Sequence, residues 1–538
     1  KKPLNCFKTK KNTNKFYRGN NFIFALQKNK MLETKNIERT RAQESTNAIE
    51  KLYISMRHLF SRGFYKPMGV SGETLRKSLL LLRPEIYGSI AEDRAELNGL
   101  VYVIERLPEG IEECQFINLT ADEGYKKSHF TAIIPEKRRR NCYRIDKDQM
   151  NIEITRGRSE IYDILTHLTF LFIESHKIQA RVSLNEGEDF IREWKYLEDI
   201  VLNNKPISEK DKEVLIVHLG NILGRTYREV SKIYKVFSTE KNPHRFFNLI
   251  YWLGKLAIKE VFEDKKRTVT FSTILIEEIG HHIYGEIWAN EIKSTLKKHD
   301  LITRPIHIIS ANMHSVLNSI YAKGALPEEA EGLKGFELFQ LLSNADSKPL
   351  QQKVKNFASE NGLIYIQDTS GTNINVQIID TDKINFDTSS FKKEHSIKEN
   401  AVIIVMDYAF GEQAFETMDE LLKPYKADDE KIFLDVKSVS IMGKAGILEG
   451  GKGDIMIPDA HIFEGTADNY PFKNELSKQD LEGFGVKAFD GSMVSVLGTS
   501  LQNKDLLKFF HDSTWNVIGL EMEGAHYQKA IQSASRIR

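Results

Sequence analysis

The segment VIGLEMEGA, residues 517–525, joins an apolar run to two carboxylates and a glycine. The run Val517–Leu520 is typical of a buried strand, and Glu521 and Glu523 follow at its carboxyl end. Open α/β sheets bind ligands at the carboxyl ends of their strands, where a carboxylate can accept hydrogen bonds from both hydroxyls of a ribose diol. The segment therefore predicts a ligand site on an α/β fold. The alternative is an acidic pair stabilised by a helix N-terminus.

Glycines cluster upstream of this segment. The tetrapeptide GKAG, residues 443–446, follows a predicted strand that ends at Met442, and a second group of glycines lies within residues 450–453. Glycines just past a strand end let the backbone approach a ligand and present N–H groups to anionic oxygens. We expect residues 443–446 to line the site, and the alternative is a tight turn with no ligand.

Residues 301–538 alternate between apolar β-type runs and helical stretches. The runs are apolar on both faces, which predicts an α/β domain with a largely buried sheet. We place the domain boundary near residue 300 because the pattern changes after Thr303. The predicted strands are Ile306–Ser310, Leu363–Gln367, Ile374–Ile379, Ala401–Met406, Lys437–Met442, Ile455–Ile457, Met493–Leu497 and Val517–Leu520, and His314–Ala322 is a predicted helix.

Residues 31–300 show mainly helical spacing of apolar residues, so we expect a mainly α-helical N-terminal domain. Short strands are expected at Leu100–Ile104 and Phe130–Ile134. The predicted helices are Ile37–Phe60, 71–82, Ser159–Ile178, Glu213–Phe237, Phe246–Val261 and Ser272–Lys297.

The net charge of +1 is the sum of a basic N-terminal tail and an acidic remainder. Residues 1–30 carry nine Lys and Arg and no Asp or Glu, which leaves residues 31–538 with a net charge of −8. We expect Met31 to be the true start and residues 1–30 to be a disordered tail; a transit peptide or a nucleic-acid arm is the alternative. An acidic body argues against a nucleic-acid binder with a broad positive face.

The composition also indicates where in the cell the protein is located. No run approaches the roughly 18 consecutive apolar residues that a membrane span needs, so we expect no membrane partner. The three cysteines, Cys6, Cys114 and Cys142, are widely spaced and odd in number. They fit neither a disulfide framework nor a paired metal clip, so we expect a cytoplasmic location.

Taken together, the C-terminal motifs resemble the nucleoside phosphorylase and nucleosidase superfamily, which includes purine nucleoside phosphorylase, methylthioadenosine/S-adenosylhomocysteine nucleosidase and AMP nucleosidase. That family has a Gly-(Ser/Thr)-x-Gly turn, a Gly-Asp-(Ile/Val) strand and a later Glu-Met-Glu signature. Here the three follow in order at 443–446, 453–455 and 521–523. The segment with Tyr408 and Gly411 resembles the family's preceding Gly-x-Gly element. The resemblance covers about residues 303–538 and implies an α/β/α domain with a mixed central sheet.

The resemblance implies cleavage of the N-glycosidic bond of a purine nucleoside or nucleotide through an oxocarbenium-like transition state. Glu523 would hold the ribose hydroxyls, and Met522 would pack against sugar and base. Of the turn residues, Gly443 and Gly446 would approach the ligand. Lys444 stands where the family has a phosphate-contacting Ser or Thr, so it either binds phosphate as a point charge or marks a lost phosphate site.

Two further departures concern catalysis. His314 takes the place of the nucleosidases' first-strand carboxylate, and we name His314 and Glu521 as candidate catalytic residues. The family's general acid lies on a strand after the Glu-Met-Glu helix, so we expect it beyond Arg538, with the domain truncated at its C-terminus. The alternative for His314 is a non-catalytic role, and for Lys444 a solvated side chain.

Residues 31–300 contain weaker signals of a metal or anion site. Glu278 and His281 share one helix face, and a second apolar helix carries His167, Glu174 and His176. The second half of a bundle-type metal motif is missing, so we expect no metal. The basic run 136–140 is expected to be a solvated loop.

The resulting prediction is a nucleosidase or phosphorylase that needs no cofactor, with inorganic phosphate as the one candidate co-substrate, and that forms a homo-oligomer. The alternative is a non-catalytic nucleoside or nucleotide sensor on the same fold, with the helical domain as its output.

Overall fold

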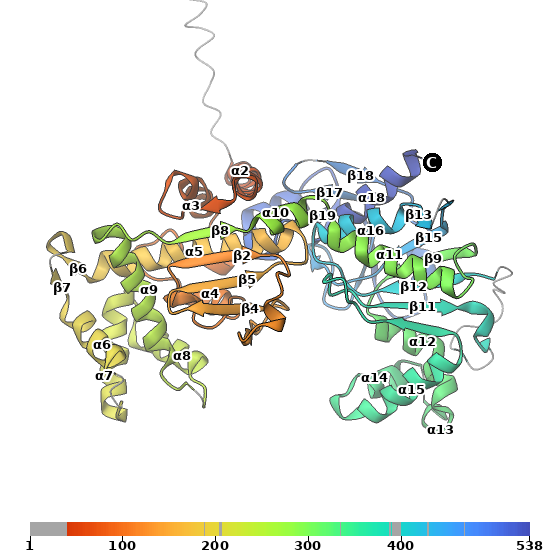
Figure 1. The fold of residues 1–538 in the computed structure, drawn as a ribbon, viewed down its shortest axis with the longest axis horizontal. Coiled ribbons are helices and arrows are strands. Elements are labelled where there is room, and N and C mark those ends of the chain that lie inside the picture. The colour runs from red at the N-terminus through yellow and green to blue at the C-terminus, as the bar shows by residue number, and fades with distance from the viewer. Residues whose placement is uncertain are drawn as a thin grey trace, which may run out of the picture.

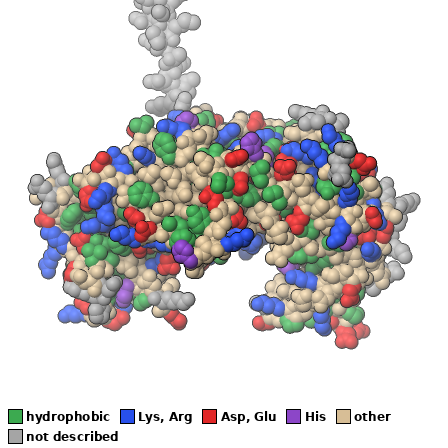
Figure 2. All heavy atoms as spheres, in the orientation of Figure 1, with side chains coloured by type: hydrophobic (Ala, Val, Ile, Leu, Met, Phe, Trp, Pro, Cys, Tyr) green, Lys and Arg blue, Asp and Glu red, His purple; other side chains and the backbone are tan. Residues whose placement is uncertain are grey.

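The computed structural model describes residues 40–187, 189–203, 207–240, 242–333, 335–386, 389, 400–427, 430–466 and 468–537. The expected basic tail, residues 1–30, lies outside the described residues. Within them, no helix combines the length and the apolar character that crossing a membrane requires. On the face drawn in Figure 2, basic and acidic side chains are interspersed.

The N-terminal part contains a six-stranded mixed sheet, so the expectation of a mainly helical domain was incomplete. Its strands are two to five residues long, too short to show a clear alternation of apolar and polar residues. In sheet order they are β1 (Phe64–Tyr65), β8 (Thr268–Phe271), β2 (Phe116–Thr120), β5 (Gln149–Glu153), β4 (Cys142–Asp146) and β3 (Ala132–Ile133). The strand expected at Phe130–Ile134 is therefore present as β3.

The strand expected at Leu100–Ile104 is wrong, because these residues belong to helix α4. The side chain of Glu96 caps this helix by accepting hydrogen bonds from the backbone N–H groups of Asn98 and Gly99. The helices of the N-terminal part are α2 (Arg41–Arg62), α3 (Val70–Leu82), α4 (Leu97–Ile104), α5 (Arg158–Val182), α6 (Arg192–Leu202), α7 (Glu209–Leu223), α8 (Tyr227–Phe237), α9 (Arg245–Phe262), α10 (Thr273–Gly280) and α11 (Ile283–Lys298).

Two of the predicted helices are each divided in two. Gly224 ends α7 in the left-handed conformation, and Thr226 starts α8 with a capping box. Likewise, His282 has a φ of 57° and separates α10 from α11. The predicted apolar spacing continued across both breaks, so only the capping residues marked them.

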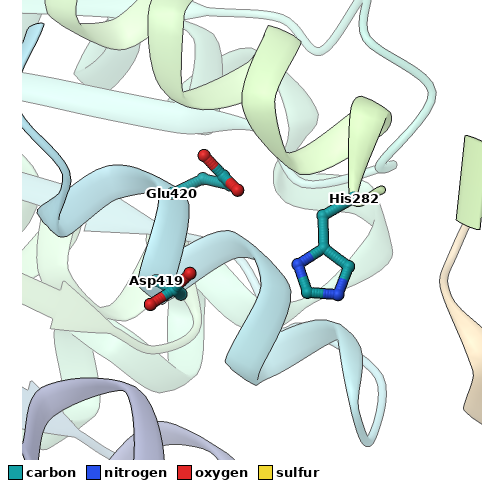
Figure 3. Close-up of side chains that lie close together, drawn as sticks. All are labelled: His282, Asp419 and Glu420. Atoms are coloured by element: carbon teal, nitrogen blue, oxygen red, sulfur yellow. The ribbon is translucent and has the colours of Figure 1, made fainter. Parts of the chain in front are cut away.

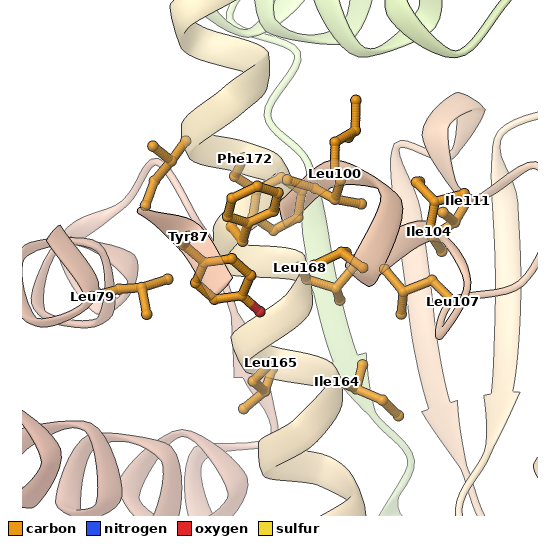
Figure 4. Packing of buried hydrophobic residues seen from close by; sticks show 14 of the residues in the cluster. Leu79, Tyr87, Leu100, Ile104, Leu107, Ile111, Ile164, Leu165, Leu168 and Phe172 are labelled. Atoms are coloured by element: carbon orange, nitrogen blue, oxygen red, sulfur yellow. The ribbon is translucent and has the colours of Figure 1, made fainter. Parts of the chain in front are cut away.

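Helix α5 forms the centre of the N-terminal part. Its residues are buried on almost every side, and Figure 4 shows Ile164, Leu168 and Phe172 of this helix packed among residues of α3, α4 and the segments that follow them. Its buried residues also include polar ones such as Glu160, His167 and Glu174, so the helix is enclosed by the core on most sides.

The C-terminal part contains two five-stranded mixed sheets, which confirms an α/β class with mixed sheets but not the single central sheet that we expected. The first has the order β10 (Leu363–Ile366), β11 (Val376–Asp380), β12 (Val402–Met406), β9 (Pro305–Ser310) and β15 (Asp435–Ile441). The predicted hairpin is β10–β11, which pair antiparallel. The helices of this region are α12 (Met313–Ala325), α13 (Pro327–Ala330), α14 (Gly335–Ser343), α15 (Lys348–Glu360) and α16 (Gln413–Leu422).

The second sheet has the order β16 (Gly446–Ile447), β20 (Val517–Glu521), β19 (Ala488–Ser495), β17 (Ile455–Phe463) and β18 (Asn469–Pro471). Helices α17 (Lys504–His511) and α18 (Gly524–Ile537) accompany it. Two small hairpins complete the described strands: β6 (Ser183–Leu184) with β7 (Asp189–Phe190), and β13 (Tyr425–Ala427) with β14 (Glu430–Ile432).

The hydrophobic cores do not separate at residue 300. One core cluster joins the helices α2, α5 and α9 to residues of the second C-terminal sheet, among them Val494, Val517 and Leu520. A second cluster joins α11 to the first C-terminal sheet, through residues such as Trp288. Figure 1 shows the segment β8–α10–α11 passing from the N-terminal part to the C-terminal part. The two parts therefore share buried surface.

Candidate functional site

The carboxyl ends of parallel strands from both C-terminal sheets meet near the start of α18. In the first sheet, Met406 of β12 and Ile441 of β15 both align with Ser310 of β9. In the second sheet, β19 and β20 also run parallel. The hydroxyl groups of Tyr527 on α18 and Ser310 lie 2.9 Å apart, so a hydrogen bond ties the two sheets together. The segments that follow these strands therefore gather in one place.

Glu523 lies half-buried directly before α18. Its Oε1 accepts a hydrogen bond of 2.8 Å from the backbone N–H of Gly411, 112 residues away in the sequence. Among the described residues, no basic side chain forms an ion pair with it. Burial raises the pKa of Glu523 to about 7. Its carboxyl group therefore changes charge near neutral pH.

Glu521 has both carboxylate oxygens engaged within the protein. Its Oε1 accepts a hydrogen bond from the hydroxyl of Ser495 and lies 3.3 Å from Nδ1 of His461. Its Oε2 accepts from the backbone N–H groups of Glu523 and Gly524. Burial opposes ionisation, but these partners outweigh it and lower the pKa of Glu521. These contacts fit an acidic residue that stabilises the start of a helix better than they fit a catalytic residue.

The glycine turn at residues 443–446 connects the two sheets. It follows β15 of the first sheet, and Gly446 begins β16, which pairs with Leu520 of the second sheet. A Cβ atom at Gly443 would lie 3.9 Å from Cε1 of Tyr408, so the exposed Tyr408 ring is beside the turn. The turn thus lies next to the segment that holds Glu523.

The other predicted site residues, His314, Lys444 and Met522, have fewer contacts than Glu521 and Glu523. His314 is exposed in the first turn of α12, where its backbone N–H donates to Asn312. Lys444 is also exposed. Within the part of the chain that the structure describes, neither side chain forms a hydrogen bond or an ion pair. Met522 packs half-buried against the core shared with the N-terminal part.

Residues of the N-terminal part reach the same place, which our sequence reasoning missed. The hydroxyl of Ser159 accepts a hydrogen bond of 2.8 Å from the backbone N–H of Glu412, and Arg158 forms an ion pair of 3.2 Å with the same residue. The guanidinium of Arg156 lies 4.9 Å from the centre of the Phe410 ring. These partners are more than 250 residues apart, and the closely spaced Arg156 and Arg158 at the start of α5 were the one local signal.

Comparison with known protein families identifies a family that matches this chain. Residues 73–336 and 329–538 match a family described as a family of unknown function, DUF6909. The chain belongs to the DUF6909 family. The match includes both the N-terminal loop at residues 156–159 and the Glu523 segment. No curated protein matches the sequence.

Several solved structures share some likeness with this DUF6909 chain. Native futalosine hydrolase of Helicobacter pylori is 13% identical over 43% of this chain and 83% of its own, with a TM-score of 0.26. Helicobacter pylori MTAN is 13% identical over 43% of this chain and 84% of its own, with a TM-score of 0.23. Scores of this size do not by themselves establish a shared fold.

One group of side chains in the DUF6909 chain has the spacing of a metal site. Ligand atoms of His282, Asp419 and Glu420 lie within 4.8 Å of one another, and Figure 3 shows them at the facing ends of α11 and α16. Lys423 already pairs with both carboxylates, at 3.2 Å from Asp419 and 2.6 Å from Glu420. Because this ammonium group already pairs with both carboxylates, we propose no metal here. Of the signals noted in the sequence, Glu278 and His281 are not in this group.

The close approach of the two loops makes a prediction for Gly411. Its φ is +55°, and a Cβ atom there would lie 2.4 Å from the hydroxyl oxygen of Ser159. We expect Gly411→Ala to lower the free energy of unfolding by about 2–4 kcal/mol, from backbone strain and overpacking. Chemical denaturation measures this loss.

Gly483→Ala is the matched control for this measurement. Gly483 also has a positive φ, +83°, but open space surrounds its Cβ position. Gly483→Ala should lower the free energy of unfolding only by the backbone strain, about 1 kcal/mol. Equal losses in the two variants would contradict the contact between Gly411 and Ser159.

Proposed function

We propose that this DUF6909 protein cleaves the N-glycosidic bond of a purine nucleoside or nucleotide, and that residues 301–538 have a nucleoside-phosphorylase-like fold. The observation that carries the proposal is the position of Glu523. It lies where strand ends from two sheets meet and is held by the N–H of Gly411. The motifs that resemble the nucleosidase superfamily lie around it, at the turn 443–446 and at residues 521–523.

In this proposal Glu523 binds the sugar. An ionised carboxylate accepts hydrogen bonds from both ribose hydroxyls, which fixes the ring relative to the reacting bond. As the glycosidic bond breaks, positive charge develops on the ribose, and a carboxylate in a half-buried site stabilises that charge more than it stabilises the neutral substrate. Glu523 therefore serves both positioning and transition-state stabilisation.

The neighbouring groups have supporting parts in the proposal. Met522, Tyr408 and Phe410 offer apolar surface for sugar and base. The backbone at Gly443 and Gly446 offers N–H groups for an anion, with Lys444 as a nearby cation. His314 remains the proposed base for a water molecule or a phosphate, because it lies after β9, whose end belongs to the same edge of the sheet.

The test is base release from a panel of purine nucleosides and their 5′-monophosphates, each with and without inorganic phosphate. Release without phosphate indicates hydrolysis, and release only with phosphate indicates phosphorolysis. Calorimetric binding is measured alongside. Binding of a nucleoside without release would overturn the enzyme and favour the sensor, and neither binding nor release would overturn both.

A further inference from the structure

Arg156 brings a cation from the N-terminal part to the proposed sugar site. It lies in the loop between β5 and α5, and its guanidinium is 4.9 Å from the centre of the Phe410 ring. Phe410 directly precedes Gly411, whose N–H binds Glu523. The positive charge of Arg156 in turn lowers the pKa of Glu523 slightly against the dominant effect of burial. Arg156 is therefore near enough to Glu523 for its charge to act on the carboxyl group.

The fold fixes the position of this loop. The hydroxyl of Ser159 accepts the backbone N–H of Glu412 at 2.8 Å, and Arg158 pairs with the Glu412 carboxylate at 3.2 Å. These contacts bind the residues on the α5 side of Arg156 to the residues that follow Phe410. Arg156 is thus held beside the site by a stable contact between loops.

Three of the arginines around Arg156 already have carboxylate partners. Arg138 and Arg140 each lie 2.7 Å from an oxygen of Asp163, and Arg158 pairs with Glu412. Arg156 forms no ion pair with any described residue. Burial lowers its pKa, the negative charge of Glu160 opposes this effect, and the positive charges of Arg140, Arg138 and Arg139 add to it. The nearby Glu160 carboxylate pairs with Arg140 at 3.3 Å and not with the Arg156 guanidinium. A half-buried cation without an ion-pair partner is unfavourable unless an anion joins it.

We propose that Arg156 binds a phosphate group beside the ribose, so that the reacting complex contains either the phosphate ester of a nucleotide or inorganic phosphate as co-substrate. The inference rests on the proposed function. A guanidinium presents a planar fork of N–H donors that matches a phosphate oxyanion, and the Phe410 ring holds that fork from one face. The N-terminal part thereby contributes directly to recognition of the substrate.

The test is calorimetric binding of three probes: adenosine, adenosine 5′-monophosphate and orthophosphate. The proteins are the full chain, Arg156→Gln, Arg156→Lys and Arg139→Gln. Arg139 is exposed, belongs to the nearby basic run 136–140 and forms no ion pair with a described residue, so it is the matched control. Thermal unfolding of each variant shows whether it folds.

The expected result is that Arg156→Gln weakens binding of the phosphate-containing probe about 10- to 100-fold and leaves adenosine within about twofold. Arg156→Lys retains part of the affinity, and Arg139→Gln is unchanged. A loss confined to the monophosphate identifies the ester, and a loss confined to orthophosphate identifies the co-substrate. Both outcomes support the inference.

Three outcomes overturn it. Unchanged binding of all probes by Arg156→Gln removes the phosphate role, and so does wild-type protein that binds no phosphate-containing probe. An equal loss for adenosine and its monophosphate would instead make Arg156 a counter-charge for Glu523. Failure of the proposed function is distinct, because orthophosphate binding that depends on Arg156 can stand without nucleoside binding or base release.

Discussion

Glu523→Gln lowers kcat/KM for base release by about 10²- to 10⁴-fold. The expectation follows from two hydrogen bonds between a carboxylate and the ribose hydroxyls, each worth about 1.5–3 kcal/mol because one partner is charged. Glutamine keeps the carbonyl oxygen that accepts the N–H of Gly411, so the loops around the site stay in place. Steady-state assays on the best substrate of the panel measure the effect.

The pH profile gives this prediction a second readout. Since burial raises the pKa of Glu523 to about 7, the ionised form increases between pH 6 and 8. We expect kcat/KM to rise up to about tenfold per pH unit below pH 7, to level above pH 8, and to lose this limb in Glu523→Gln.

The matched control is Glu360→Gln, at the exposed end of α15, which should leave activity and profile unchanged. Activity of Glu523→Gln within threefold of wild type would refute the assignment of this residue to the sugar.

Glu416→Gln removes a pH dependence of stability. Glu416 is buried on α16 between Glu412 and Glu420, and its Oε1 has no hydrogen-bond partner among the described residues. Burial, aided by the negative charge of Glu412, raises its pKa to about 8 from an ordinary 4.5. The folded chain therefore binds this proton more tightly than the unfolded chain does.

The sign of the effect follows from proton linkage. Between pH 4.5 and 8 the unfolded state has released the proton and the folded state has kept it, so the free energy of unfolding falls as the pH rises. The contribution is fully present below pH 4.5 and is lost through pH 8. From pH 5 to 8.5, the stability of Glu416→Gln relative to wild type should rise by on the order of 4 kcal/mol.

Denaturant unfolding at both pH values measures this difference. Glu286→Gln is the control, because Glu286 is exposed on α11, the helix that packs against α16. A constant difference between Glu416→Gln and wild type across this range would show that Glu416 is ionised in the folded protein.

The residues after β9, β12, β15 and β20 illustrate how far the sequence predicts the site. Strands β12 and β20 are largely apolar runs, β9 and β15 include polar residues, and local signals follow β15 and β20: glycines at 443–446 and carboxylates at 521–523. These signals predicted which segments face the site, because the carboxyl ends of parallel strands share one edge. They did not predict that the carboxylate oxygens of Glu521 accept hydrogen bonds from Ser495 and from the start of α18.

The N-terminal part was less predictable for a physical reason. Its strands are two to five residues long and its sheet forms through pairing of segments far apart, such as β1 with β8. Such short strands carry little periodicity, and their pairing depends on tertiary packing. The long helices were easier to predict because each contains several turns of its own apolar stripe, whereas the eight-residue α4 was predicted as a strand.

The sequence by itself determined the α/β class of residues 301–538, the main helices and the glycine and carboxylate segments, because all of these follow from patterns within a few neighbouring residues. Only the tertiary structure decided the contact of Glu523 with Gly411, the engagement of Glu521, the core shared across residue 300 and the arrival of Arg156 beside Phe410. These features depend on contacts between residues more than 100 positions apart or on competition among nearby partners, and neither leaves a local pattern in the chain.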